Sequence, residues 1–257
     1  MQDIDYILDF VVHLGREMLE CGANLERVNM SIEVLCKSYN LREVNISLLN
    51  NSISVSARNA GEPAKVRQEA VPINGIHLER LRRLNNLSYR VCQEKPKPEK
   101  LEDMLFEALM VPNYPTQILL LGYIIAMTCL CRLFGGGIRD IIVADMSTVL
   151  LFFLSNHLAG KQLNRIITNV VSMFIAGVIA LLFVYIGFAQ NLYAIIITNA
   201  FYLIPGIPMV NSVRNILCGN EMNGILELLK VILEVLMIVA GLFIAYFLFG
   251  QWYTLSW

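Results

Sequence analysis

The residues best suited to chemistry surround a break in the apolar second half of this sequence. The apolar run 192–204 leads directly into Pro205-Gly206-Ile207-Pro208, where two prolines remove backbone N–H donors and Gly206 frees the backbone. Broken backbone at membrane depth is tolerated where it is buried or lines a wet cavity, and transporters use it to direct carbonyls and helix ends at ions or substrate. We therefore expect a substrate or ion pathway that includes Asn199, Pro205, Gly206, Pro208 and Asn211. The alternative is a kink at the cytoplasmic interface, where the chain simply leaves the membrane.

Two further candidates are carboxylates inside apolar segments, where an ionised group is costly without a partner or a function. Asp145 shares a helical face with polar residues, namely Thr148, Ser155 and Asn156. This face favours an aqueous path or a proton site, and the alternative is a carboxylate hydrogen-bonded to a neighbouring helix. Glu234 lies four residues after Lys230, so that the two could neutralise each other. We expect Asp145, Thr148 and Glu234 to belong to the pathway and name the two carboxylates as candidate proton carriers.

The rest of the sequence offers little for other chemistry. The first 110 residues contain no nucleophile–base pair, P-loop or dinucleotide fingerprint, so we expect no enzyme activity and no cofactor. The six cysteines form no CxxC motif and the three histidines are far apart, so we expect no metal site. Residues 1–110 hold 14 Lys and Arg against 16 Asp and Glu, which argues against nucleic acid as a partner.

The elements that must position these residues are long apolar helices. The chain is 56% hydrophobic with a mean hydropathy of +0.57, and a bilayer core of about 30 Å needs roughly 20 apolar helical residues to cross it. Five stretches after residue 110 qualify, with the fourth broken. They predict an all-α membrane bundle over 111–257 with spans at about 115–134, 138–158, 166–188, 192–210 and 225–249.

Residues 1–110 predict a soluble α+β domain in front of this bundle. Apolar residues at helical spacing predict a helix from about Asp3 to Cys21 that ends at Gly22, and a second helix with Asn24 as its N-cap. Alternating residues predict strands at 44–48 and 53–57 joined by a turn at 50–51, with a weaker strand at 64–71. Two further amphipathic helices are expected at 78–91 and 99–109.

The distribution of basic residues predicts the orientation. The chain starts acidic, without the pattern of a signal peptide, and Lys161, Arg165 and Arg214 fall in loops on the same side as the N-terminus. We therefore expect a multi-pass protein of the bacterial cytoplasmic membrane with its N-terminus in the cytoplasm. Five spans place the C-terminus outside, with Trp252, Tyr253 and Trp257 at the outer interface.

Three short motifs, in order along nearly the whole chain, resemble those of the bacterial threonine/serine exporter family. They are Gly22-Ala23-Asn24-x-x-Arg27-Val28, Gly136-Gly137-x-x-Asp140, and Pro205-Gly206-x-Pro208-x-x-Asn211 followed by Gly219 and Gly224. Asn24 and Asn29 stand where that family usually has Glu. The layout, a soluble domain followed by a membrane bundle, is also similar.

The resemblance implies a subunit of a secondary-active exporter of small carboxylate metabolites, coupled to protons. Full-length exporters of the family carry a second membrane half, so this chain resembles the larger subunit of the split form. In that form a small membrane protein similar to the missing half is the partner, and a homo-oligomer is a further option. The split form is associated with succinate, a C4-dicarboxylate, and the fused form with threonine and serine.

Two other classes of function are weighed against this one. A membrane-anchored hydrolase would need a catalytic arrangement in residues 1–110, which the sequence does not show. A receptor or scaffold would use the spans only as an anchor, and would need neither a broken fourth span nor a carboxylate within a span.

Overall fold

The computed structural model describes residues 2–49, 52–59, 61–72, 76–110, 114–159 and 164–250. The chain forms two compact units. The first joins Met1–Pro112 to Ile207–Leu228, and the second joins Asn113–Gly206 to Leu229–Trp257. The first unit therefore takes in a late segment in addition to the expected domain at 1–110. The single boundary near residue 110 stays a prediction.

The first unit contains a small antiparallel sheet of order β1-β2-β3 and several helices. Its elements are α1 (Gln2–Glu20), α2 (Leu25–Ser38), β1 (Arg42–Leu49), β2 (Ser52–Arg58), β3 (Lys65–Ala70), α3 (Leu78–Glu94), a short 3₁₀ turn (Pro98–Lys100), α4 (Leu101–Leu109), α9 (Gly206–Leu217) and the start of α10 (Glu221–Phe249). The predicted helices and strands of residues 1–110 are thus present, including the weak strand. The expected turn at 50–51 lies outside the described residues.

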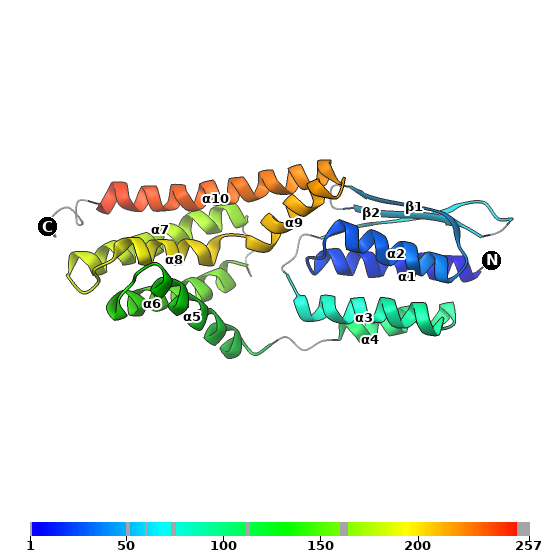
Figure 1. Cartoon of the computed structure of the whole chain (residues 1–257), viewed down its shortest axis with the longest axis horizontal. Helices are drawn as coiled ribbons and strands as arrows, with labels where there is room; N and C mark the ends of the chain where they lie inside the picture. Colours follow the sequence, from blue (N-terminus) through cyan, green and yellow to red (C-terminus); the bar gives the residue numbers. More distant parts are fainter. Residues whose placement is uncertain are drawn as a thin grey trace. The chain divides into compact units, whose positions relative to one another are not determined.

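Alternation along β2 explains how the sheet is covered. Ile53, Val55 and Ala57 are fully buried, whereas the residues between them are not, as a strand with one face on the core requires. Helices α1 and α2 pack on this face, and α3 and α4 pack on the far side of those two helices (Figure 1). The N-terminal part is therefore a three-layer α+β domain with its core around α1.

The second unit consists of helices: α5 (Thr116–Leu133), α6 (Ile138–Ala159), α7 (Arg165–Tyr185), α8 (Leu192–Leu203) and most of α10. Four helices of the described chain are long and apolar enough to cross a membrane: α5, α6, α7 and α10. The bent pair α8 and α9 gives a fifth candidate if it is counted as one span. The mostly helical chain with four or five candidate spans agrees with the predicted fold class, and the predicted break in the fourth span is confirmed.

Candidate substrate pathway

Asp140 is held by three backbone amides at one end of the second unit. One carboxylate oxygen accepts from the N–H of Gly137 at 2.8 Å, and the other accepts from Gln190 at 2.7 Å and Asn191 at 3.0 Å. Asp140 lies in the first turn of α6 and is buried, and Asn191 caps α8. A carboxylate in the first turn of a helix is also favoured by the helix dipole. The arrangement joins the N-terminal ends of α6 and α8, which indicates a structural task for this residue of the predicted motif.

The glycine turn beside Asp140 is tightly packed. A Cβ on Gly136 would lie 2.6 Å from the sulfur of Cys131 and 2.9 Å from its carbonyl oxygen, so no side chain fits there. A Cβ on Gly137 would meet only the Asp140 carboxylate, at 3.5 Å. Gly136 is thus required by close packing, whereas Gly137 supplies an amide to Asp140.

Asp145 lies on α6 and faces α5. One carboxylate oxygen accepts from the hydroxyl of Thr128 at 2.7 Å, and the other is buried without a hydrogen-bond partner among the described residues. Thr148, the next candidate along the helix, is fully buried and donates to the carbonyl of Ala144. A hydrogen bond to a neighbouring helix is the alternative interpretation of Asp145. The bond from Thr128 fits this alternative, but it satisfies only one of the two carboxylate oxygens.

Asn199 on α8 is the least satisfied polar side chain in this unit. It is fully buried, and neither its amide oxygen nor its amide nitrogen has a hydrogen-bond partner in the described part of the chain. Burying such an amide unpaired costs roughly 1–3 kcal/mol. A cost of this kind needs a compensating function, and an amide that can both donate and accept suits a polar ligand.

Asn199 and Asp145 lie at similar depths in the second unit. Each residue follows the start of its helix by seven positions, from Leu192 to Asn199 and from Ile138 to Asp145. At 1.5 Å per residue this places both about 10 Å from helix ends that Asp140 ties together. Since α6 packs against α8, the two positions lie at a similar depth on neighbouring helices.

Two polar residues of α7 were not predicted for the site. Asn169 and Ser172 are buried, and the amide nitrogen of Asn169 and the hydroxyl of Ser172 lack partners among the described residues. Ser172 stands in a stripe of small residues that also suits close helix packing, with Ala176 and Ala180. The available signal is a group of polar residues, Thr168, Asn169 and Ser172, near the start of an otherwise apolar helix.

Glu234 does not pair with Lys230 as expected. Its carboxylate forms an ion pair at 3.2 Å with Arg165, the first residue of α7, while Lys230 lies on the exposed surface of α10. The i, i+4 pairing is therefore corrected. The largely buried Glu234 turns toward α7, where Arg165 reaches it from the helix end.

The break itself is built from few residues. Helix α8 ends at Leu203, Ile204 is extended, and the Gly206 amide donates to the Ile204 carbonyl at 2.9 Å. Pro208 sits in the first turn of α9, where a helix has no partner for the backbone N–H, so this proline costs no bond. A Cβ on Gly206 would meet nothing within 4 Å. Gly206 is the first residue of α9 and does not have a positive φ, so neither space nor backbone conformation requires a glycine at this position.

The remaining candidates lie in the first unit. Gly22 has φ +90° and ends α1, and Asn24 accepts from the Arg27 amide at 2.9 Å, as an N-cap does. The Arg27 guanidinium donates to Asn85 of α3 at 2.9 Å, and Ala23 packs against the domain core. Asn211 donates to the Gly22 carbonyl at 3.2 Å. Gly22, Ala23, Arg27 and Asn211 thus belong to one unit, and Asp145, Thr148, Asn199 and Glu234 to the other.

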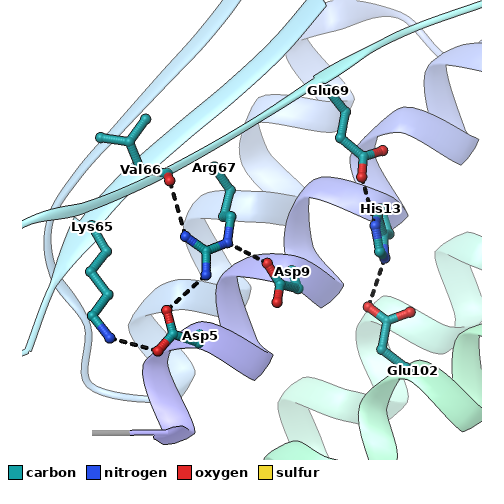
Figure 2. A network of polar contacts seen from close by, with 8 residues as sticks. All are labelled: Asp5, Asp9, His13, Lys65, Val66, Arg67, Glu69 and Glu102. Atoms are coloured by element: carbon teal, nitrogen blue, oxygen red, sulfur yellow. Dashed lines mark hydrogen bonds and ion pairs between the residues drawn. The ribbon is translucent and has the colours of Figure 1, made fainter.

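A charged network in the first unit joins α1 to β3 and α4 (Figure 2). His13 contacts Glu69 at 2.6 Å and Glu102 at 2.8 Å, and Arg67 contacts Asp5 at 2.8 Å. Burial alone would lower the pKa of His13, but the two carboxylates outweigh it and raise that pKa above its usual value. The network connects α1 to β3 and α4 through ion pairs and hydrogen bonds. No group of three or more His, Cys, Asp or Glu residues in the described chain is arranged to hold a metal ion.

Long apolar helices with a bent pair among them are typical of multi-pass membrane proteins, and transporters in particular use broken helices of this kind. Comparison with known proteins gives the family. The family described as "Putative threonine/serine exporter" matches residues 9–249, and the chain belongs to it.

Two curated relatives show how far the similarity extends. A threonine/serine exporter of Corynebacterium glutamicum is 22% identical over 248 residues, which cover 91% of this chain and 50% of that protein. A protein named "Probable succinate transporter subunit YjjP" from Klebsiella aerogenes is 22% identical over 121 residues, 47% of each chain. The chain thus spans about half the length of the curated relatives it matches. No solved structure matches it significantly.

Proposed function

We propose that this chain is a subunit of a secondary-active exporter that moves small carboxylate-bearing metabolites out of a bacterial cell across the inner membrane. Membership of the exporter family supports the direction and class of transport. The observation that carries the proposal is Asn199 in the first half of the broken span, which is fully buried and has no hydrogen-bond partner among the described residues. A passive anchor would gain stability from an apolar residue at this position, whereas a pathway needs a polar group there.

The residues have separate roles in this proposal. Asn199 contacts the substrate, together with Thr148 and the backbone at Pro205–Gly206, all of which belong to the second unit. Asp145 and Glu234 are candidate carriers of the coupling proton, because Asp145 keeps a buried carboxylate oxygen without a hydrogen bond among the described residues and Glu234 is a largely buried carboxylate that pairs with Arg165.

The substrate is proposed from the balance of charge in the second unit. Arg165 pairs with Glu234, and Arg132 donates to the Gly136 carbonyl. A dicarboxylate needs cations for both its ends, whereas a zwitterionic hydroxy amino acid can offer its ammonium group to Asp145 and its carboxylate to an amide. We therefore favour threonine or serine. Succinate is the second candidate because of the name of the Klebsiella relative.

A second membrane half is needed in this proposal. The alignment covers half of the Corynebacterium protein, and the Klebsiella relative is named as a subunit. We propose a separate small membrane protein similar to the remaining half as the partner, with homo-oligomers as a further form. The N-terminus would be cytoplasmic and the C-terminus external, although Lys161, Trp252, Tyr253 and Trp257, which bear on this orientation, lie outside the described residues.

The test is efflux from cells of the native host loaded with radiolabelled threonine, serine or succinate. Asp145→Asn removes a charge but keeps an oxygen for Thr128, so the protein should reach the membrane in normal amount while its efflux falls. Asp103→Asn, an exposed change on α4, is the matched control. Export of none of the three compounds by the wild-type chain with its natural partner overturns the proposal, and unchanged efflux in Asp145→Asn removes this residue from the mechanism.

A further inference from the structure

Two motifs that are far apart in the sequence meet in the first unit. The side-chain amide of Asn211 on α9 donates to the backbone carbonyl of Gly22, which ends α1. One turn further along α9, the Arg214 guanidinium lies 3.2 Å from the carboxylate of Glu26 in the first turn of α2. Figure 1 shows α9 beside the start of α2. The segment after the break is therefore fastened to the loop and helix that carry the first motif.

The start of α10 adds a second attachment. The side-chain amide of Asn223 donates to the carbonyl of Leu48 at the end of β1, at 2.6 Å. Helices α9 and α10 also pack tightly together, because a Cβ on Gly224 would lie 2.8 Å from the Ser212 carbonyl oxygen and from the Ile216 amide nitrogen. Asn215 and Glu227 join the two helices at 3.1 Å. The helical hairpin 206–228 is thus stiff and is held at both of its helices.

We infer that the soluble domain and the hairpin 206–228 move as one body, and that the Pro205–Gly206 break is the hinge through which this body acts on the transport pathway. The chain passes between the two units after Pro112, after Gly206 and within α10, which runs unbroken from Glu221 to Phe249 and so moves with the hairpin, whereas α8 is joined to it only through the break. Ile204 is extended there and the helical hydrogen-bond ladder is interrupted. A few residues of this kind can absorb the backbone rotation of a domain movement. Asn211 and Asn223 are positioning residues, since they act through the hinge and not on substrate.

The one-body part is tested by a reversible crosslink within the whole chain. The thiol of Cys218 lies 3.3 Å from the Glu26 carboxylate, so Glu26→Cys creates a pair that a short, thiol-cleavable bifunctional reagent can bridge. The matched control is Glu26→Cys with Cys218→Ser, which offers one thiol only. We expect a high yield of the intramolecular crosslink, found by peptide mapping, and efflux in the crosslinked protein at least equal to that of the uncrosslinked variant. Absence of the crosslink, or loss of efflux when it forms, overturns the inference.

The coupling part is tested by removing the attachments. We expect Asn211→Ala and Asn223→Ala to lower efflux about fivefold or more at equal membrane abundance, within the usual range of coupling between sites. Asn86→Ala on the exposed side of α3 should leave it unchanged. In the double variant Asn211→Ala, Glu26→Cys, the crosslink should restore efflux and its cleavage should abolish it again. If Asn211→Ala lowered efflux only by damaging the structure, efflux would not recover when the crosslink forms. Failure of the crosslink to restore efflux therefore overturns the coupling.

The transport part of this inference rests on the proposed function, and the experiment separates the two. If the wild-type chain exports nothing, the proposed function fails, while the yield of the crosslink and hydrogen exchange at the Gly22 loop still report on the docking. Asn211→Ala should speed exchange of the amides in α9 and at residues 22–24 together. Exchange that changes in only one of these segments would contradict a single body.

Discussion

Replacing Asn199 by leucine should make the protein more stable and less active. The two side chains have nearly the same shape, and the buried amide has no hydrogen bond to lose among the described residues. Removing an unpaired buried amide should recover roughly 1–3 kcal/mol. For a chain of this size each kcal/mol shifts Tm by roughly 2–4 °C, so we expect a rise in Tm of roughly 2–12 °C.

The assay is thermal unfolding of the purified chain in detergent, followed by a thiol-reactive dye, with efflux measured in parallel. Thr198→Val at the neighbouring position is the matched control, because it removes a buried hydroxyl that donates to the Ala194 carbonyl at 2.7 Å. This control should leave Tm unchanged or lower it. A lower Tm in Asn199→Leu would show that the amide is satisfied in the folded protein. Full efflux in the same variant would refute a role in transport.

Three further predictions follow from packing, hydrogen bonding and charge. Asp140→Ala should lower the free energy of unfolding about three times as much as Asp140→Asn does. The alanine removes all three hydrogen bonds from backbone amides and the asparagine removes one, each worth roughly 1.5–3 kcal/mol. Equal Tm values for the two variants would contradict this role of the Asp140 carboxylate. Gly224→Ala should lower Tm by forcing α9 from α10, whereas Gly122→Ala, with open space around it, should not; similar Tm values would argue against the tight hairpin. Because the folded pKa of His13 is raised, its stabilising contribution is complete below the unfolded value of about 6.5 and is lost as pH rises through the folded value. Protection factors of the amides in α1 and α4 of the whole chain, which correct for the faster intrinsic exchange at higher pH, should therefore fall over that range in the wild type and not in His13→Gln. A flat wild-type profile of protection factors would contradict the prediction.

Most elements could be predicted from the sequence because their signals are local. Gly22 and Asn24 mark the end of one helix and the start of the next, and the structure places both there. Alternation at Ile53, Val55 and Ala57 likewise marks a strand with one buried face. The break after Leu203 follows from two prolines and a glycine within four residues.

Partners across helices could not be predicted, because they depend on tertiary packing. Spacing on one helix predicts an ion pair between Glu234 and Lys230. The structure instead shows an ion pair between Glu234 and Arg165, which lies on another helix. The position of Asn211 near the break predicts that it belongs to the pathway. In the structure its side-chain amide donates a hydrogen bond to the Gly22 carbonyl. No periodicity links residues that are 189 positions apart. The roles of the candidate residues in transport stay predictions.

The return of residues 207–228 to the soluble domain has a consequence for biosynthesis. About 95 residues, from 112 to 207, separate the last part of the domain's first segment from its second. At translation rates of about 5–20 residues per second, the ribosome needs roughly 5–20 s to supply the missing piece. During this interval the nascent domain leaves the carbonyls of Gly22 and Leu48 and the carboxylate of Glu26 without their native contacts. Synthesis of the intervening helices therefore precedes completion of the domain, so the front of this protein can finish folding only after most of its apolar helices have been made.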